Sequence, residues 1–153
     1  MSLPGPEAPS RRAAEAPRHR QGRTLERLLL IREIVAAFVR ARLLLRRVPL
    51  EAALAELRPT RVLDHGPGGE PDHSEARRLG WAVSRTLRLL PGDTRCLVRS
   101  LVLTRLLSRR GIAATLVIGA RPGPSFLAHA WVELGGIPVL DPGDGSFARL
   151  VEL

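Results

Sequence analysis

Residues 90–111 read L-P-G-D-T-R-C-L-V-R-S-L-V-L-T-R-L-L-S-R-R-G, and this stretch predicts the central helix of the domain. A Pro-Gly pair ends the preceding segment, Asp93 or Thr94 can cap the new helix, and Gly111 suits its C-terminal end. The single cysteine of the chain, Cys96, falls in the first turn of this helix. Its interior is expected to consist of Leu97, Leu101, Thr104, Leu106 and Leu107.

Three strand-like segments follow the central helix. They cover residues 113–120, 126–134 and 137–141, and residues 147–152 can add a fourth strand. The two-residue link Gly135-Gly136 predicts a tight β-hairpin between the second and third segments. Because helices come first and an antiparallel sheet follows, the sequence predicts an α+β fold.

Two longer helices are expected before the central one. The first starts near Thr24 and carries an apolar stripe at Leu28, Ile31, Val35, Phe38 and Leu45. The second runs from Asp72 or Ser74 to about residue 90, and its buried face is Ala76, Leu79, Val83, Leu87 and Leu90. A short helix over residues 50–57 is expected between them.

The Pro- and Arg-rich residues 1–22 are expected to form a disordered tail. We therefore predict a single domain over residues 23–153, with a helical part (23–90) and a C-terminal core (91–153). One cysteine precludes an internal disulfide, and the first residues lack signal-peptide form, so a cytoplasmic protein is expected.

Charge and composition narrow the classes of partner. The net charge is +9, but the arginines are spread along helix faces, and aromatic residues make up only 3% of the chain. Nucleic-acid binding is therefore not expected, and an acidic peptide or protein fits the charge better. The longest apolar run, residues 34–39, is too short to span a bilayer, and membrane contact is not favoured.

Two Asp-His pairs, Asp64-His65 and Asp72-His73, raise the question of a metal site. They are separated by prolines and glycines in a spacing that matches no helical ligand pair, and no cysteine lies near them. We interpret them as turn residues and predict neither a metal nor another cofactor.

Cys96, His129 and Asp141 have the order and placement of a thiol nucleophile, its base and an orienting carboxylate. The unpaired N–H groups of a first helical turn stabilise a thiolate and can also bind an oxyanion. In the Gly-Gly hairpin, Asp141 falls within one or two residues of the position opposite His129. Asp144 is the fallback orienting residue. The chain contains no asparagine, which favours a carboxylate in this role.

Alternation along residues 127–134 assigns side chains to the two faces of the sheet. The cleaner core face consists of Ala128, Ala130, Val132 and Leu134. The other face carries His129 and Trp131, and we expect the helix with Cys96 to lie across it, so that Trp131 walls the site against water. Glu133 is expected to face solvent. Each site residue also has a structural interpretation: a buried apolar cysteine, a core histidine and a plain turn at Asp141.

Two long stretches carry a resemblance to a known family: C-L-V-R-S-L-V-L-T-R-L-L-S-R-R-G-I-A-A-T-L-V-I-G-A and, later, A-H-A-W-V-E-L-G-G-I-P-V-L-D. They resemble the transglutaminase-like cysteine peptidases that remove leader peptides in lasso-peptide maturation, most strongly over about residues 80–145. The resemblance implies a transglutaminase/papain-like core in which Cys96 is the nucleophile, His129 the general base and Asp141 the orienting carboxylate.

The same resemblance implies several partners. The substrate would be a precursor peptide with its leader, and the lasso cyclase would act next. In many members of the family a winged-helix module binds the leader, whereas residues 1–90 show a tail and helices. A separate leader-binding winged-helix protein is therefore expected as a partner.

Three other functional classes stay open on the sequence. The net charge of +9 suggests one of them, a nucleic-acid or membrane-surface adaptor, which steep salt-dependent binding to DNA or anionic vesicles would support. A non-catalytic binding or scaffold protein could keep the fold, and its Cys96 would react no faster than a free thiol. An acyl-transferring, transglutaminase-like enzyme would share the acyl-enzyme and differ in the group that attacks it.

Overall fold

The computed structural model describes the chain except for residues 1–15, 50–51, 53–72, 91–95, 123–126 and 141–142. Its described helices are α1 (Ala16–Arg47), α3 (His73–Leu87) and α4 (Cys96–Arg109). The strands are β1 (Thr115–Arg121), β2 (Leu127–Leu134), β3 (Ile137–Pro138) and β4 (Ala148–Glu152), and they form one antiparallel sheet in the order β3-β2-β1-β4. The predicted α+β fold is confirmed.

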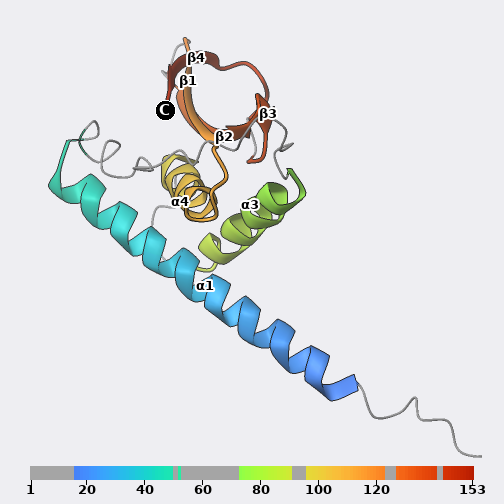
Figure 1. Ribbon diagram of the computed structural model, residues 1–153. Coiled ribbons are helices and arrows are strands. Elements are labelled where there is room, and N and C mark those ends of the chain that lie inside the picture. Colours follow the sequence, from blue (N-terminus) through green and yellow to red (C-terminus); the bar gives the residue numbers. More distant parts are fainter. Residues whose placement is uncertain (1–15, 50–51, 53–72, 91–95, 123–126, 141–142) are drawn as a thin grey trace, which may run out of the picture.

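The helices gather on one side of a strongly curved sheet (Figure 1). Helix α4 lies in the middle, in contact with β1 and β2 on one side and with α1 and α3 on the other. Its buried side chains are Val98, Ser100, Leu101, Val102, Leu103, Leu106 and Leu107. The predicted central helix is therefore confirmed, although Leu97 and Thr104 are only partly buried.

Helix α3 follows its predicted pattern closely. Ala76, Leu79, Val83 and Leu87 are fully buried, as their helical spacing indicated. The helix ends at Leu87, before the predicted residue 90. Gly80 is also buried, and a Cβ at this position would lie 2.5 Å from the carbonyl oxygen of Val139. A glycine is therefore needed for α3 to approach the segment that follows β3 so closely.

Helix α1 differs from the prediction in its start and in its buried face. It begins at Ala16 rather than Thr24, within the segment predicted as a tail, and Pro17 falls in the first turn, where a proline is tolerated. The buried side chains are Ile34, Ala37, Phe38 and Ala41, whereas Leu28 and Ile31 are exposed. The predicted stripe was wrong at these two residues because the N-terminal half of α1 extends beyond α3 and α4 (Figure 1).

The C-terminal end of α4 ties the helices together through charge. The Arg110 guanidinium contacts Glu33 of α1 at 2.8 Å and Glu75 of α3 at 3.7 Å, and it also donates to the carbonyl oxygen of Leu106 at 2.9 Å. A cation at a helix C-terminus is favourable because the last carbonyl groups carry partial negative charge. After this contact Gly111, with φ of 74°, ends the helix as predicted.

The Gly135-Gly136 turn closes the β2–β3 hairpin as predicted. Both glycines have positive φ, 56° and 79°, a conformation that glycine adopts at little cost. The pairs Glu133↔Pro138 and Leu134↔Ile137 set the hairpin register.

Several sequence predictions fall on residues outside this description. The short helix expected over residues 50–57 and the Asp64-His65 pair belong to this group, and of the second Asp-His pair only His73 is described. Within the described ranges, no helix has the length and apolar character needed to cross a membrane.

Candidate active site

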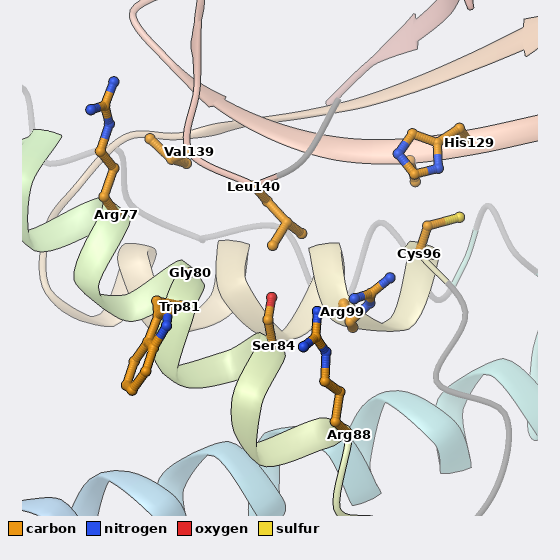
Figure 2. A pocket seen from close by; sticks show the side chains of 11 residues that line it. Arg77, Gly80, Trp81, Ser84, Arg88, Cys96, Arg99, His129, Val139 and Leu140 are labelled. Atoms are coloured by element: carbon orange, nitrogen blue, oxygen red, sulfur yellow. The ribbon is translucent and has the colours of Figure 1, made fainter. Parts of the chain in front are cut away.

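A pocket of about 290 Å³ is bounded by α3, by the N-terminal end of α4 and by the sheet. Cys96, the first residue of α4, and His129 of β2 both line it. Figure 2 shows the thiol and the imidazole at the same end of the pocket. The fold thus brings together two of the three residues in the expected catalytic set, although 33 positions separate them in the chain.

A buried hydrogen bond fixes the start of α4 against β2. The hydroxyl group of Ser100, one turn beyond Cys96, donates to the carbonyl oxygen of Ala130 at 3.0 Å. Ala130 directly follows His129, so one bond links the neighbourhoods of both candidate catalytic side chains. Sequence reasoning missed Ser100, although a lone serine in the apolar run L-V-R-S-L-V-L was a signal for a buried polar contact.

The helix packs on the opposite face of the sheet from the one predicted. Ala130, Val132 and Leu134 share the hydrophobic core with α4, whereas Trp131 does not belong to it. The expectation that α4 lies across the Trp131 face was therefore wrong. The physical reason is that Ala130, Val132 and Leu134 form an apolar face that the apolar side chains of α4 can cover.

Trp131 lies on the face of the sheet opposite to the one that α4 covers, and its ring stacks with the imidazole of His129. The two ring centroids are 6.0 Å apart with an angle of 19° between the planes. Trp131 is buried, and it is absent from the described residues that line the pocket. A Cβ at Gly119 would lie 2.9 Å from the indole, so the glycine makes room for this ring. The structure places Trp131 as a support for His129.

Glu133 lies on the same face of the sheet as Trp131. The sequence suggested that it faces solvent, but its side chain is buried and the residue is only 4% exposed. It accepts a hydrogen bond from Trp131 Nε1 at 2.7 Å and two from the Arg149 guanidinium of β4, at 3.2 and 3.0 Å. The hydrogen bonds from Arg149 to Glu133 raise the pKa of the guanidinium. Alternation placed Glu133 on the correct face, but the sheet curves around that face and closes it.

Replacement of Glu133 by glutamine is expected to destabilise the fold by about 1–3 kcal/mol, because a buried acceptor loses its charge and Arg149 loses the buried one of its two carboxylate partners. The measurement is urea unfolding followed by circular dichroism. Glu152→Gln is the matched control, since Glu152 is exposed and bonds the same guanidinium at 2.8 Å. The control should change stability by less than about 0.5 kcal/mol. Equal effects of the two changes would contradict the assigned role of Glu133.

His129 has a second aromatic neighbour in Phe147, with ring centroids 5.2 Å apart. Gly143 closes this side of the ring: its φ is 79°, and a Cβ there would lie 3.0 Å from Phe147 and 3.5 Å from His129 Cδ2. These contacts restrict the orientation of the imidazole. The sequence analysis missed Phe147, because nothing local indicates that the segment before β4 returns to β2.

Asp144, the fallback orienting residue, has both carboxylate oxygens engaged elsewhere. One oxygen accepts from Arg121 Nη1 at 2.8 Å, and the other accepts from the backbone N–H and the hydroxyl group of Ser146. Hydrogen bonds from Ser146, together with the charge of Arg121, lower the pKa of this carboxyl. These contacts make Asp144 a stabiliser of the 143–147 segment.

Asp141 lies outside the described residues, so its orienting role stays a prediction. The structure describes the chain up to Leu140, the residue directly before Asp141. After the β2–β3 pairs, the N–H groups of Val139 and Leu140 donate to the carbonyl oxygen of Val132 at 2.9 and 3.4 Å. Leu140, one residue before Asp141, lines the same pocket as His129.

Comparison with known proteins adds to this geometry. A profile of the transglutaminase-like superfamily matches residues 35–152, which include Cys96, His129 and the four strands that the structure describes. The chain belongs to the transglutaminase-like superfamily. This result bears out the resemblance found in the sequence and agrees with helices followed by an antiparallel sheet.

A shorter match connects this transglutaminase-like chain to a curated protein. Over 46 residues it is 50% identical to the microcin J25-processing protein McjB of Escherichia coli. The match covers 30% of this chain and 22% of that protein. No solved structure matches the chain.

Proposed function

We propose that this transglutaminase-like protein is a cysteine peptidase that removes the leader from a ribosomally synthesised precursor during lasso-peptide maturation. The observation that carries the proposal is the meeting of Cys96 and His129 in one pocket at the start of a helix. The similarity to the microcin J25-processing protein supports a precursor peptide as the substrate.

In the proposed reaction His129 would first take the proton of the Cys96 thiol, and the resulting thiolate would attack the scissile carbonyl carbon. The resulting oxyanion would bind backbone N–H groups in the first turn of α4, which point toward the helix N-terminus. His129 would then protonate the departing amine, which becomes the new N-terminus of the core peptide. The leader would remain bound to Cys96 as a thioester, with the C–N bond broken.

Hydrolysis completes the proposed cycle. His129 would take a proton from water as the water attacks the thioester, and the leader would leave with a free carboxylate while the thiol is restored. In this scheme Asp141 would accept a hydrogen bond from the imidazole and stabilise its cationic form. The ring contacts with Trp131 and Phe147 would hold the imidazole in position.

A direct test is mass spectrometry of precursor incubated with the purified protein in isotopically labelled water. Peptidase activity predicts a leader carrying one labelled oxygen at its new carboxylate. A leader joined to an added amine instead would support the acyl-transferring alternative. The scaffold alternative predicts no Cys96-dependent product, together with alkylation of Cys96 by iodoacetamide at the rate of a free thiol.

Helix α1 is our candidate docking surface for a separate leader-binding protein. Leu25, Leu28, Leu29 and Ile31 are between 45% and 60% exposed on the half of the helix that extends from the domain. Arg32 is also exposed next to them. An apolar patch beside an exposed arginine suits a protein partner that has an apolar groove with an acidic residue at its edge.

The partner is expected to raise the cleavage rate, because tethering the leader gives the scissile bond an effective concentration of roughly millimolar at Cys96. Leu28→Ser combined with Arg32→Glu should reduce this stimulation about tenfold or more. The measurement is kcat/KM on the full-length precursor with and without the partner.

Leu43→Ser is the matched control, since Leu43 is similarly exposed at 43% near the other end of α1. It should retain the stimulation. Full activity of the isolated protein would contradict the partner requirement, and unchanged stimulation in the Leu28 and Arg32 variant would contradict the docking site. Arg32→Glu with Arg40→Glu offers a purely electrostatic version of the test, since Arg40 is exposed on the same helix.

A further inference from the structure

The pocket beside Cys96 is lined with arginine. Three of its described lining residues are Arg77 and Arg88 from the α3 segment and Arg99 from α4, and no aspartate or glutamate occurs among them. Arg77, Trp81, Ser84 and Arg88 follow one another at spacings of four, three and four residues, which places them on one helical face. One face of α3 and of the turn that follows it therefore presents two guanidinium groups and a hydroxyl group to the pocket.

Arg99 gives a second and independent indication that the pocket suits an anion. Its Nε atom is buried and has no hydrogen-bond partner among the described residues. Leaving a buried donor of a charged group unpaired is costly, and the cost disappears when a ligand supplies an acceptor. Arg99 lies one helical turn beyond Cys96, so an acceptor bound to it would be close to the thiol (Figure 2).

The described ion pairs leave these three guanidinium groups without a carboxylate. Arg78, Arg109, Arg110, Arg121 and Arg149 each contact a glutamate or aspartate, whereas Arg77, Arg88 and Arg99 contact none in the described ranges. Arginine forms paired hydrogen bonds with planar carboxylates, so guanidinium groups that have no carboxylate partner in the described ranges are selective sites for them.

We infer that the pocket selects a substrate with an acidic side chain close to the bond that Cys96 attacks. The inference rests on the proposed function for its choice of a peptide substrate. The aspartate or glutamate binds Arg99 and Arg88, and Ser84 offers a further hydroxyl donor. Arg77 lies at the end of the pocket away from Cys96 (Figure 2) and attracts acidic residues farther along the peptide. Trp81, which is 66% exposed, gives the peptide an apolar surface at the same pocket.

The first test needs no substrate. Iodoacetate and iodoacetamide both alkylate a thiolate with loss of iodide, and they differ in the negative charge of iodoacetate. Because Cys96 is the single cysteine, total alkylation reports this site alone. The ratio of the iodoacetate rate to the iodoacetamide rate should be about tenfold higher in the folded protein than in the urea-unfolded chain.

Arg88→Glu should remove most of this increase, and Arg88→Glu with Arg99→Glu should reverse it. Arg88 is exposed, so the single variant is expected to fold even where the double variant does not. Arg78→Glu is the matched control: Arg78 is on the same helix but does not line the pocket. The helix N-terminus is the same in all variants, so the difference between Arg88→Glu and Arg78→Glu isolates the arginine effect. Equal ratios in these two variants would overturn the inference.

The second test uses pools of synthetic peptides that differ in Asp or Glu against Asn or Gln at each position flanking the cleaved bond. At one position, kcat/KM should fall about 10- to 100-fold on loss of the charge, and Arg88→Glu should abolish that preference. Cys96-dependent cleavage without any acidic preference would overturn the inference alone. Absence of Cys96-dependent cleavage would instead overturn the proposed function, and the alkylation ratio would still report on the pocket.

Discussion

Cys96→Ala is expected to abolish leader removal, with kcat/KM lowered by on the order of 10⁴-fold or more. The physical reason is that the proposed thioester cannot form without the sulfur atom. Cys96→Ser should be nearly as inactive, because a hydroxyl group is far harder to ionise than a thiol in the same environment. The measurement is the initial rate of leader release, followed by mass spectrometry.

The fold should survive both changes at Cys96, since the residue is the first of α4 and only partly buried. We expect a stability change within about 1 kcal/mol, to be checked by thermal unfolding. The Ser100 bond to Ala130 and the apolar face of α4 remain intact in these variants. Cleavage retained in Cys96→Ala would end the thiol-peptidase interpretation.

His129→Ala should lower kcat/KM at least about 100-fold, the effect of losing a general base. Asp141→Asn should preserve the local shape and still reduce activity strongly, because it removes the charge that would stabilise the imidazolium. Asp144→Asn is the matched control, since the contacts of Asp144 are with Arg121 and Ser146. It should leave activity within a few-fold of the unaltered protein.

Comparison of the Asp141 and Asp144 variants distinguishes the two possible orienting carboxylates. If Asp144→Asn is the damaging change while Asp141→Asn is silent, the orienting residue has been assigned to the wrong carboxylate. Loss of activity in His129→Ala accompanied by unfolding would show a structural role. Thermal unfolding of each variant therefore belongs to the same measurement.

Much of the architecture follows from local physical rules. The spacing of Ala76, Leu79, Val83 and Leu87 predicted the buried face of α3, because these residues recur at the period of a helix. The Gly135-Gly136 turn predicted the hairpin, because two consecutive residues with positive φ strongly favour glycine. In both cases the information lies within a few neighbouring residues.

Long-range packing accounts for the errors. Leu28 and Ile31 continue the apolar pattern of α1, but this part of the helix extends from the domain, and among the described residues only Leu30 of the 28–31 stretch packs against the core, so these two remain exposed. The sequence predicted that Glu133 faces solvent, whereas hydrogen bonds from Arg149 and Trp131 enclose it in the structure. The polarity of a residue limits the environments in which it is stable, but whether it is buried depends on segments that are distant in sequence.

The features of the candidate site also fall into those that local sequence determines and those that tertiary packing determines. The sequence by itself determined the order of Cys96, His129 and Asp141, the helix start at the cysteine and the strand at the histidine, because caps, breaks and periodicity are local. Tertiary structure alone decided that α4 packs on the Ala130 face and that Trp131 and Phe147 contact the imidazole. It also decided that Arg88, directly after α3, and Arg99 of α4 line one pocket with Cys96. Such meetings depend on how helices and strands pack across long separations in sequence, which no short stretch of residues encodes.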